Sequence, residues 1–409
     1  MHLGRPPTAI PEDLRARGDE LGPEVAWARA VDEAIERRVD AVVLAGDLVD
    51  RDRDFFVAYS QLKHGVERLT AAGIRVLAVA GNHDTEVLPR LAGEIERLEL
   101  LGAGGQWQAR AVEGVSVLGW SFPRPQVRTS PLASLPKARP EGTVIGLLHC
   151  DLDQAESRYA PVSRRELEAA PVDAWLLGHI HRPDNLDTDR PIGYLGSISA
   201  LRASETGARG PWLIQVEGRD IAADQLPLAP LRYEVLEVDA SDLDDAGELP
   251  ARILKYARER LRALAELARP PTAVGLRITL SGQSSIATAL TEKAAELAAD
   301  GRSWQEEGIA SFIHRIEPAL LPRLDLKRLA RQSDPCGLLA RRLLALQSPD
   351  GEEYQRLVRL ARESLSPTLQ AREFHDLEHD PDDAALADWL QRAGRQALIR
   401  LAGQRDERR

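Results

Sequence analysis

The first half of the chain alternates short apolar runs with longer stretches in which apolar residues recur every three or four positions. Short continuous apolar runs are typical of strands that are buried on both faces. We therefore expect strands at residues 40–44, 74–80, 143–148, 174–177 and 212–216. The apolar spacing over residues 23–38 and 55–72 predicts amphipathic helices that cover these strands.

The second half has a different pattern, which begins after a proline-containing connector at residues 226–231. Short apolar runs and helical periodicity then alternate once more. They predict strands at residues 233–238 and 273–280 and helices at residues 254–268 and 288–299. From Leu320 onward the pattern is helical and rich in Arg and Glu, with no obvious strand.

These changes of pattern predict three domains, as the length of 409 residues also suggests. We expect a layered α/β core at residues 1–230, a small α+β domain at residues 231–318 and a helical C-terminal region at residues 319–409. We expect the functional site in the core, because the carboxyl ends of strands in α/β sheets are where sites are built.

Composition narrows the class of protein. The chain is 43% hydrophobic and 29% charged, the balance of a soluble globular protein, and its net charge is −11. That charge excludes a generally basic protein that coats nucleic acid, but it is compatible with a local positive groove. No run approaches the roughly 18 apolar residues of a membrane span. Cys150 and Cys336 are too few for a disulfide framework, so we expect a reducing, cytoplasmic location.

Polar clusters directly follow four of the expected strands. The strand at 40–44 is followed by Gly46-Asp47, and the strand at 74–80 by Gly-Asn-His-Asp at 81–84. The strand at 143–148 is followed by His149, and the strand at 174–177 by Gly-His-Ile-His at 178–181. Carboxylate, amide and imidazole ligands suit Mn²⁺, Fe or Zn²⁺ better than a thiolate-loving metal. A single Asp can bridge two ions about 3.5–4 Å apart, and such a pair can hold both oxygens of a displacement at phosphorus.

The order of these clusters resembles the calcineurin-like metallophosphoesterase superfamily over most of residues 1–230. The resemblance implies an α/β fold with a two-sheet αββα sandwich, and two divalent metal ions, Mn²⁺ first with Fe or Zn²⁺ as alternatives. It also implies a set of metal ligands, namely His2, Asp47, Asn82, His149, His179 and His181. Within this set Asp47 bridges the two ions, His2 and His181 belong to the first ion, and the other three residues belong to the second.

The resemblance assigns chemistry to two more residues. His83 would act on the phosphate and the leaving oxygen, Asp84 would position the His83 ring, and a metal-bound hydroxide would be the nucleophile. For Asp84, and still more for Asp50, a turn or cap residue is the alternative interpretation.

Other segments are similar to the DNA repair exonuclease branch, the nuclease-subunit type of bacterial SbcD and shorter YhaO-like relatives. They are WSFP at 120–123, Gly196-Ser197 followed by ETGARG at 205–210, and PLRYEV at 230–235, which resembles the capping domain of that branch. The branch implies DNA as substrate, a coiled-coil ABC/SMC-type ATPase docked by the tail helices, and a homodimer. Arg5 and Arg182, adjacent to metal motifs, are the predicted phosphate-binding residues.

The chain departs from the family pattern at its start. The family opens with a buried strand that ends in Asp-x-His, whose Asp and His both bind the first metal, and here His2 falls on that His. We expect a true start upstream of Met1 in preference to real loss of the strand. A missing central strand would leave backbone groups unpaired at about 1–3 kcal/mol each. As it stands, the first metal site keeps His2, Asp47 and His181 at most.

The sequence therefore predicts a metal-dependent DNA phosphodiesterase, an exonuclease or endonuclease subunit that acts in DNA repair. Two alternatives stay open. One is a phosphoesterase that acts on a small phosphodiester or a phosphoprotein, although such enzymes need no large region beyond the core. The other is an inactive scaffold subunit of an ATPase complex.

His375 and His379 match an inverted zinc-protease pattern, but their charged surroundings are typical of a solvated segment.

Overall fold

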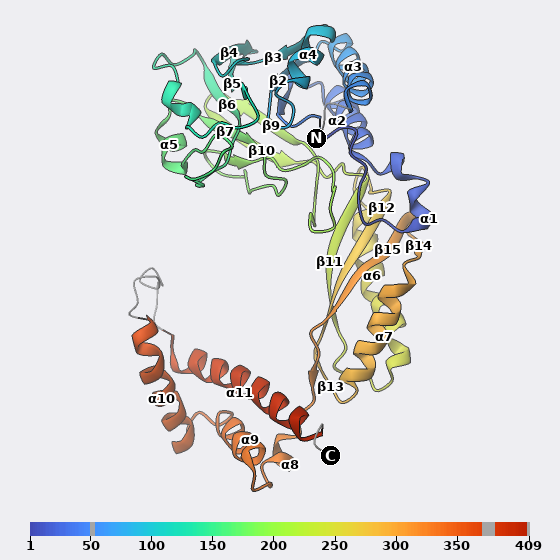
Figure 1. Ribbon diagram of the computed structural model, residues 1–409, viewed down its shortest axis with the longest axis vertical. Helices are drawn as coiled ribbons and strands as arrows, with labels where there is room; N and C mark the ends of the chain where they lie inside the picture. The colour runs from blue at the N-terminus through green and yellow to red at the C-terminus, as the bar shows by residue number, and fades with distance from the viewer. Residues whose placement is uncertain (50–53, 370–380, 407–409) are drawn as a thin grey trace. The chain divides into compact units, whose positions relative to one another are not determined.

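The computed structural model describes residues 1–409 except 50–53, 370–380 and 407–409 (Figure 1). Asp50 and the pattern at residues 375–379 therefore lie outside the described residues. The chain forms two compact units. The first comprises residues 1–238, 250–279 and 294–317, and the second comprises residues 239–249, 280–293 and 318–409.

Two β-sheets form the centre of the first unit. The smaller sheet is parallel in the order β1-β2-β3, and its strands span Ala41–Ala45, Arg75–Val79 and Leu98–Leu100. The larger sheet has the order β4-β5-β6-β7-β8, with β4 antiparallel to β5 and the remaining pairs parallel. Its strands span Trp107–Val112, Val115–Trp120, Thr143–His149, Ala174–Gly178 and Ile192–Tyr194.

Helices cover the outer face of each sheet. The side chains of α2, α3 and α4 share one apolar cluster with β1 and β2, and these helices span Pro23–Arg37, Phe55–Ala71 and Val87–Glu94. On the larger sheet, α5 (Arg164–Ala169) begins with a capping box between Ser163 and Glu166. The indole of Trp175 in β7 donates to the carbonyl of Leu167 in α5 (3.1 Å). These layers confirm the expected α/β class and the two-sheet sandwich.

The main core lies between the two sheets. It combines Leu77 and Val79 of β2 with Ile145 and Leu147 of β6 and Leu176 of β7. Every residue of β6 is buried, as expected for a strand covered on both faces. The apolar runs at residues 74–80, 143–148 and 174–177 therefore form the central strands β2, β6 and β7.

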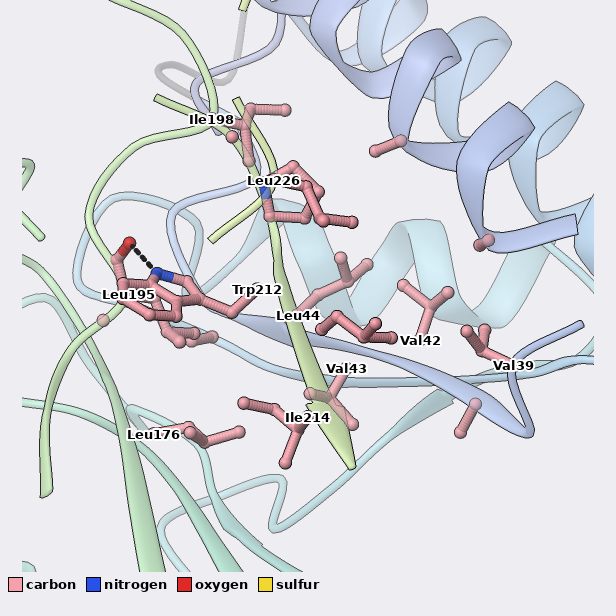
Figure 2. Close-up of a pocket in the computed structure, with 18 of the residues that line it drawn as sticks. Val39, Val42, Val43, Leu44, Leu176, Leu195, Ile198, Trp212, Ile214 and Leu226 are labelled. Carbon is pink, nitrogen blue, oxygen red and sulfur yellow. Dashed lines mark hydrogen bonds between the residues drawn. The ribbon is translucent and has the colours of Figure 1, made fainter. Parts of the chain in front are cut away.

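Strand β1 is less well covered than β6. Strand β2 occupies one edge of β1, and no described strand pairs with the other edge. A cavity of about 510 Å³ is lined by β1 and by β9 (Trp212–Glu217), which forms a hairpin with β10 (Asp220–Gln225). Figure 2 shows Val43 and Ile214 among the apolar side chains around this space. Val42 and Val43 are consequently only half-buried.

A second sheet region of the chain follows the core, with the strand order β11-β12-β15-β14. Its strands span Leu231–Asp239, Ala273–Ser281, Ile309–Pro318 and Ser303–Glu306, and its helices α6 and α7 span Leu249–Ala265 and Ala287–Asp300. The hydroxyl of Tyr233 in β11 donates to the carbonyl of Thr8 (3.0 Å). The strand pair β14–β15 is an addition to what the sequence pattern predicted.

The second unit is mainly helical. Helices α8, α9, α10 and α11 span Leu326–Leu329, Pro335–Ala345, Glu352–Leu369 and Asp383–Asp406. The apolar core of these helices includes Leu343, Tyr354 and Leu398. The expectation of no strand after Leu320 is wrong at one point, because β16 (Leu321–Pro322) pairs with β13 (Gln283–Ser284).

Short 3₁₀ and helical turns complete the chain. They are α1 (Glu12–Arg15), η1 (Gly18–Glu20), η3 (Pro131–Ser134) and η4 (Ala246–Glu248). Among the described residues, no helix is both long enough and apolar enough to cross a membrane.

Candidate metal centre

The predicted metal ligands all come from the carboxyl ends of strands or from the start of the chain. Asp47 follows β1 and Asn82 follows β2 in the smaller sheet. His149 is the last residue of β6, and His179 follows β7 in the larger sheet. Because the two sheets pack face to face, the ends of these strands meet in one place.

Four of the predicted ligands form a dense group. The ligand atoms of Asp47, His149 and His179 all lie within 4.8 Å of one another. The Nε2 atom of His149 is 3.4 Å from Asp47 Oδ2, 3.0 Å from Asn82 Oδ1 and 3.2 Å from His179 Nδ1. The set that the resemblance assigned to the second ion is thus gathered around a single point.

The other two predicted ligands form a sparser group on the other side of Asp47. The Nε2 atoms of His2 and His181 are 3.0 Å apart, and His2 Nε2 is 4.0 Å from Asp47 Oδ2. Asp47 therefore lies between the two groups, where a bridging carboxylate would lie. The structure brings all the predicted ligands together, and the role of each stays a prediction.

Backbone conformation in this region is unusual. Asp47 and His179 have positive φ angles of 50° and 103°, which non-glycine residues rarely adopt. Such strained residues are concentrated at functional sites. Gly46 has a φ of 85°, and a Cβ atom there would lie 2.7 Å from both Gly81 N and His149 Nδ1. Only glycine fits this close approach between the loops that follow β1 and β2.

The electrostatics of the groups suit a cation. Burial lowers the pKa of His2 to about 2, and burial together with the neighbouring His149 lowers the pKa of His179. Burial alone would raise the pKa of Asp47, but the imidazoles of His149 and His2 outweigh it and hold that pKa below its ordinary value. Neutral imidazoles and an ionised carboxylate are the forms that bind metals. The nitrogen and oxygen donors therefore fit a divalent ion of the Mn²⁺, Fe or Zn²⁺ kind.

Asp84 has backbone partners. Its side chain is fully buried, and its two oxygens accept hydrogen bonds from the N–H groups of Leu48 (2.7 Å) and Gly81 (2.8 Å). Burial and the nearby charge of Asp47 raise the pKa of Asp84 to about 6. These bonds tie together the loops that follow β1 and β2. The role of Asp84 in positioning the His83 ring stays a prediction.

The predicted catalytic His83 lies beside the sparser group. Its backbone N–H donates to Asp47 Oδ1 (3.0 Å), and its ring meets that of His2 edge to face with the centroids 5.3 Å apart. Of the two predicted phosphate-binding residues, Arg182 is exposed directly after His181, and the backbone N–H of half-buried Arg5 donates to the His2 carbonyl (3.1 Å). All three residues thus adjoin the metal centre.

Two carboxylates that the sequence analysis did not single out contact predicted ligands. Glu205 Oε1 is 2.7 Å from His181 Nδ1, and Asp151 Oδ1 is 3.2 Å from His179 Nε2. The segment that contains Glu205 had served only as a marker of the branch. Asp151 had a weak signal, its position two residues after His149.

Comparisons with known proteins agree with this geometry. The family model described as calcineurin-like phosphoesterase matches residues 18–183, and that of the middle domain of metallophosphoesterase YhaO matches residues 233–320.

Three relatives illustrate the similarity. The chain is 29% identical over 258 residues to the "uncharacterized metallophosphoesterase YhaO" of Bacillus subtilis, covering 59% of this chain and 62% of the relative. It is 28% identical over 257 residues to the "DNA double-strand break repair protein Mre11" of Haloferax volcanii, covering 59% of this chain and 55% of the relative. To the protein of the same name from Aeropyrum pernix it is 27% identical over 286 residues, covering 65% of this chain and 68% of the relative.

The match spans less than two thirds of the first two of these relatives. Even so, two adjoining family models and the relatives all indicate one superfamily. Residues 18–183 therefore form a calcineurin-like metallophosphoesterase domain, and residues 233–320 form a YhaO-type middle domain after it.

Proposed function

We propose that this protein is a metal-dependent DNA phosphodiesterase that acts as a nuclease subunit in DNA repair. The observation that carries the proposal is the convergence of two ligand groups on Asp47, in a chain whose middle domain is of the YhaO type. The relatives named as DNA double-strand break repair proteins support DNA as the substrate.

In this proposal His2 and His181 would hold one divalent ion, and Asn82, His149 and His179 would hold the other. Asp47 would contribute to both. Mn²⁺ is the proposed metal. When bound, such ions polarise phosphoryl oxygens and supply an activated water for attack at phosphorus. The protein's part is to hold the ligands in metal-binding forms. Burial favours neutral His2 and His179, and the neighbouring imidazoles favour ionised Asp47. Burial alone would lower the pKa of His149, but the neighbouring Asp47 outweighs it and raises that pKa.

The remaining site residues would act on the substrate. His83, whose ring adjoins that of His2, would donate its ring proton to the leaving oxygen. Arg5 and Arg182 would contact phosphates of the DNA backbone. With a net charge of −11, the chain would bind DNA with strong salt dependence, through such local contacts.

We also propose a division of labour along the chain. Residues 1–230 cleave, residues 231–318 cap the groove that holds duplex ends, and residues 319–409 dock a coiled-coil ABC/SMC-type ATPase, with the complex built on a homodimer. Exposed apolar side chains on the helices of the C-terminal region, Leu338, Leu360 and Trp389, support a docking role.

The test is Mn²⁺-dependent degradation of a linear DNA duplex by the full chain, with the His83→Ala variant and a closed circular duplex for comparison. We expect the linear duplex to be degraded and the variant to be strongly impaired, and cleavage or sparing of the circle distinguishes an endonuclease from an exonuclease. Hydrolysis of bis-p-nitrophenyl phosphate without DNA cleavage would overturn the DNA assignment and favour a small phosphodiester. No hydrolysis of either substrate would overturn the enzymatic proposal.

A further inference from the structure

Glu205 is a buried carboxylate with two fixed partners. Its side chain lies in the loop after β8, and its exposed fraction is 8%. Glu205 Oε2 accepts the backbone N–H of Leu201 (2.8 Å), and Oε1 is 2.7 Å from His181 Nδ1. Because the first bond anchors the carboxylate to the loop, its second oxygen has little freedom to leave the imidazole.

This contact determines which nitrogen of His181 carries the proton. An ionised carboxylate can only accept, so Nδ1 is the protonated nitrogen of neutral His181. The lone pair is then on Nε2, and that atom faces His2 Nε2 at 3.0 Å, inside the metal centre. The carboxylate thus selects the tautomer whose free nitrogen points at the proposed ion.

Asp151 makes the same arrangement with His179, but through the opposite ring nitrogen. Asp151 Oδ1 is 3.2 Å from His179 Nε2, and its other oxygen accepts the hydroxyl of Ser157. The remaining nitrogen, Nδ1, faces His149 Nε2 at 3.2 Å. Two carboxylates that each bind the nitrogen pointing away from the centre, one Nδ1 and the other Nε2, indicate a shared role. A chance ion pair would have no such preference.

The fully buried imidazole of His149 follows the same rule with a backbone acceptor. His149 Nδ1 donates to the carbonyl of Ala45 (3.0 Å), which leaves Nε2 directed at Asp47 and Asn82. Metal-binding histidines usually donate their second nitrogen to a carboxylate or carbonyl, which fixes the ring and raises its basicity.

We propose that Glu205 and Asp151 are positioning residues of the metal centre, which fix the ring orientation and tautomer of His181 and His179 respectively. The proposal deepens the proposed metal-dependent function and rests on it. Neither carboxylate belongs to the predicted ligand set, and neither need touch an ion or the substrate to have this effect.

The first experiment measures Mn²⁺ binding to the full chain by titration calorimetry, without DNA. Glu205→Ala and Asp151→Ala should each weaken one class of Mn²⁺ site by about 10- to 100-fold. Glu205→Gln and Asp151→Asn keep an oxygen acceptor and should recover part of that loss. Asp184→Ala is the matched control, because Asp184 lies three residues after His181 but its side chain accepts the backbone N–H of Tyr194 (2.9 Å) and not a ligand imidazole.

The outcomes separate this proposal from the proposed function. If wild-type protein binds Mn²⁺ and both alanine variants bind it equally well, the positioning role is overturned and the metal-dependent function stands. If wild-type protein binds no divalent ion, the proposed function falls. A loss in Asp184→Ala as large as in Glu205→Ala would also overturn the proposal, because it would show a general effect on the loop.

A second experiment needs no stable variant at either carboxylate. Nitrogen-15 NMR of histidine-labelled, metal-free protein reports which ring nitrogen carries the proton, and His181→Gln and His179→Gln assign the two signals. We expect His181 in the Nδ1–H form and His179 in the Nε2–H form. The reverse tautomers, or rapid averaging of both, would contradict the proposal even if metal binds.

Discussion

The two halves of the metal centre are built differently. Asn82, His149 and His179 lie at the ends of β2, β6 and β7, and each of these strands has a paired neighbour on both edges. His2 lies on a short segment outside any strand, and backbone bonds hold this segment, such as that from the His2 N–H to the Asp47 carbonyl (2.9 Å). Asp47 follows β1, whose second edge has no partner among the described strands. The dense half is therefore held by fully paired strands, whereas in the sparse half only His181 follows such a strand and His2 lies in a loop.

This difference in strand pairing explains why the dense half of the site is the more rigid one. The donors of the dense half are held by strands whose backbone groups are already paired, so little entropy is lost when an ion binds. The cavity along β1 is lined by His2 and His181 of the sparse half and also by Asp47 and His179, so it borders both halves and the difference in rigidity rests on the strand pairing. We expect the dense half to bind metal more tightly than the sparse half.

The largest effect should come from removing a ligand of the dense half. His149→Ala should lower the rate of phosphodiester hydrolysis by about 10³-fold, because several kcal/mol of charge stabilisation by the ion are lost. His2→Ala should cost less, because the sparse half holds its ion more weakly. The measurement is hydrolysis of bis-p-nitrophenyl phosphate together with the metal content of each variant.

His64→Ala is the control for both variants, since His64 is exposed on α3 and remote from the predicted ligand set in the sequence. It should behave as wild type. The expectation that the dense half binds metal more tightly is contradicted if His2→Ala loses as much bound metal as His149→Ala.

The next effect separates chemistry from metal binding. His83→Ala should lower the rate by about 10²-fold, within the range of general acid–base catalysis, while the number of bound ions stays unchanged. The reason is that His83 adjoins His2 by its ring but is not a predicted ligand. Parallel measurements of rate and of Mn²⁺ stoichiometry test this. A variant that loses its metal along with its activity would make His83 a ligand and contradict the assigned role.

A smaller effect concerns the backbone that supports Asp47. Gly46→Ala should reduce the free energy of unfolding by about 2 kcal/mol or more, because a side chain at positive φ is strained and its Cβ would meet Gly81 and His149. Gly73→Ala is the matched control, since Gly73 has nearly the same φ of 82° but nothing within 4 Å of an added Cβ. Urea unfolding of both variants isolates the cost of the contact. Equal losses would contradict it.

The positions of the dense-half residues could be predicted from the sequence because their signals are local, and their role as ligands stays a prediction. The apolar runs before His149 and His179 identify buried strands, and a histidine at the end of such a strand lies at the sheet edge where sites form. The same reasoning located Asp47 and Asn82. In each case the information is contained in a few consecutive residues.

The sequence could not predict contacts that depend on how distant loops meet. Glu205 reaches His181 across 24 positions, and the carboxylate of Asp84 binds the backbone N–H of Leu48 across 36. A lone acidic residue in a polar loop has the same local pattern whether it contacts solvent or a ligand. The strand β14 was missed for a related reason, because Ser303–Glu306 has little apolar periodicity and is defined by its pairing with β15.

The smallest effect tests the open edge of β1 itself. Because the cavity of about 510 Å³ beside β1 and β9 is lined largely by apolar side chains, the folded protein should bind an apolar fluorescent dye such as anilinonaphthalene sulfonate. Val43→Asp places a charge in this space and should reduce dye fluorescence several-fold. Val57→Asp, at an exposed position on α3, should leave the signal unchanged. Equal dye binding by wild-type protein and both variants would mean that the edge of β1 is closed in solution, and the two halves of the metal centre would then be equally well supported.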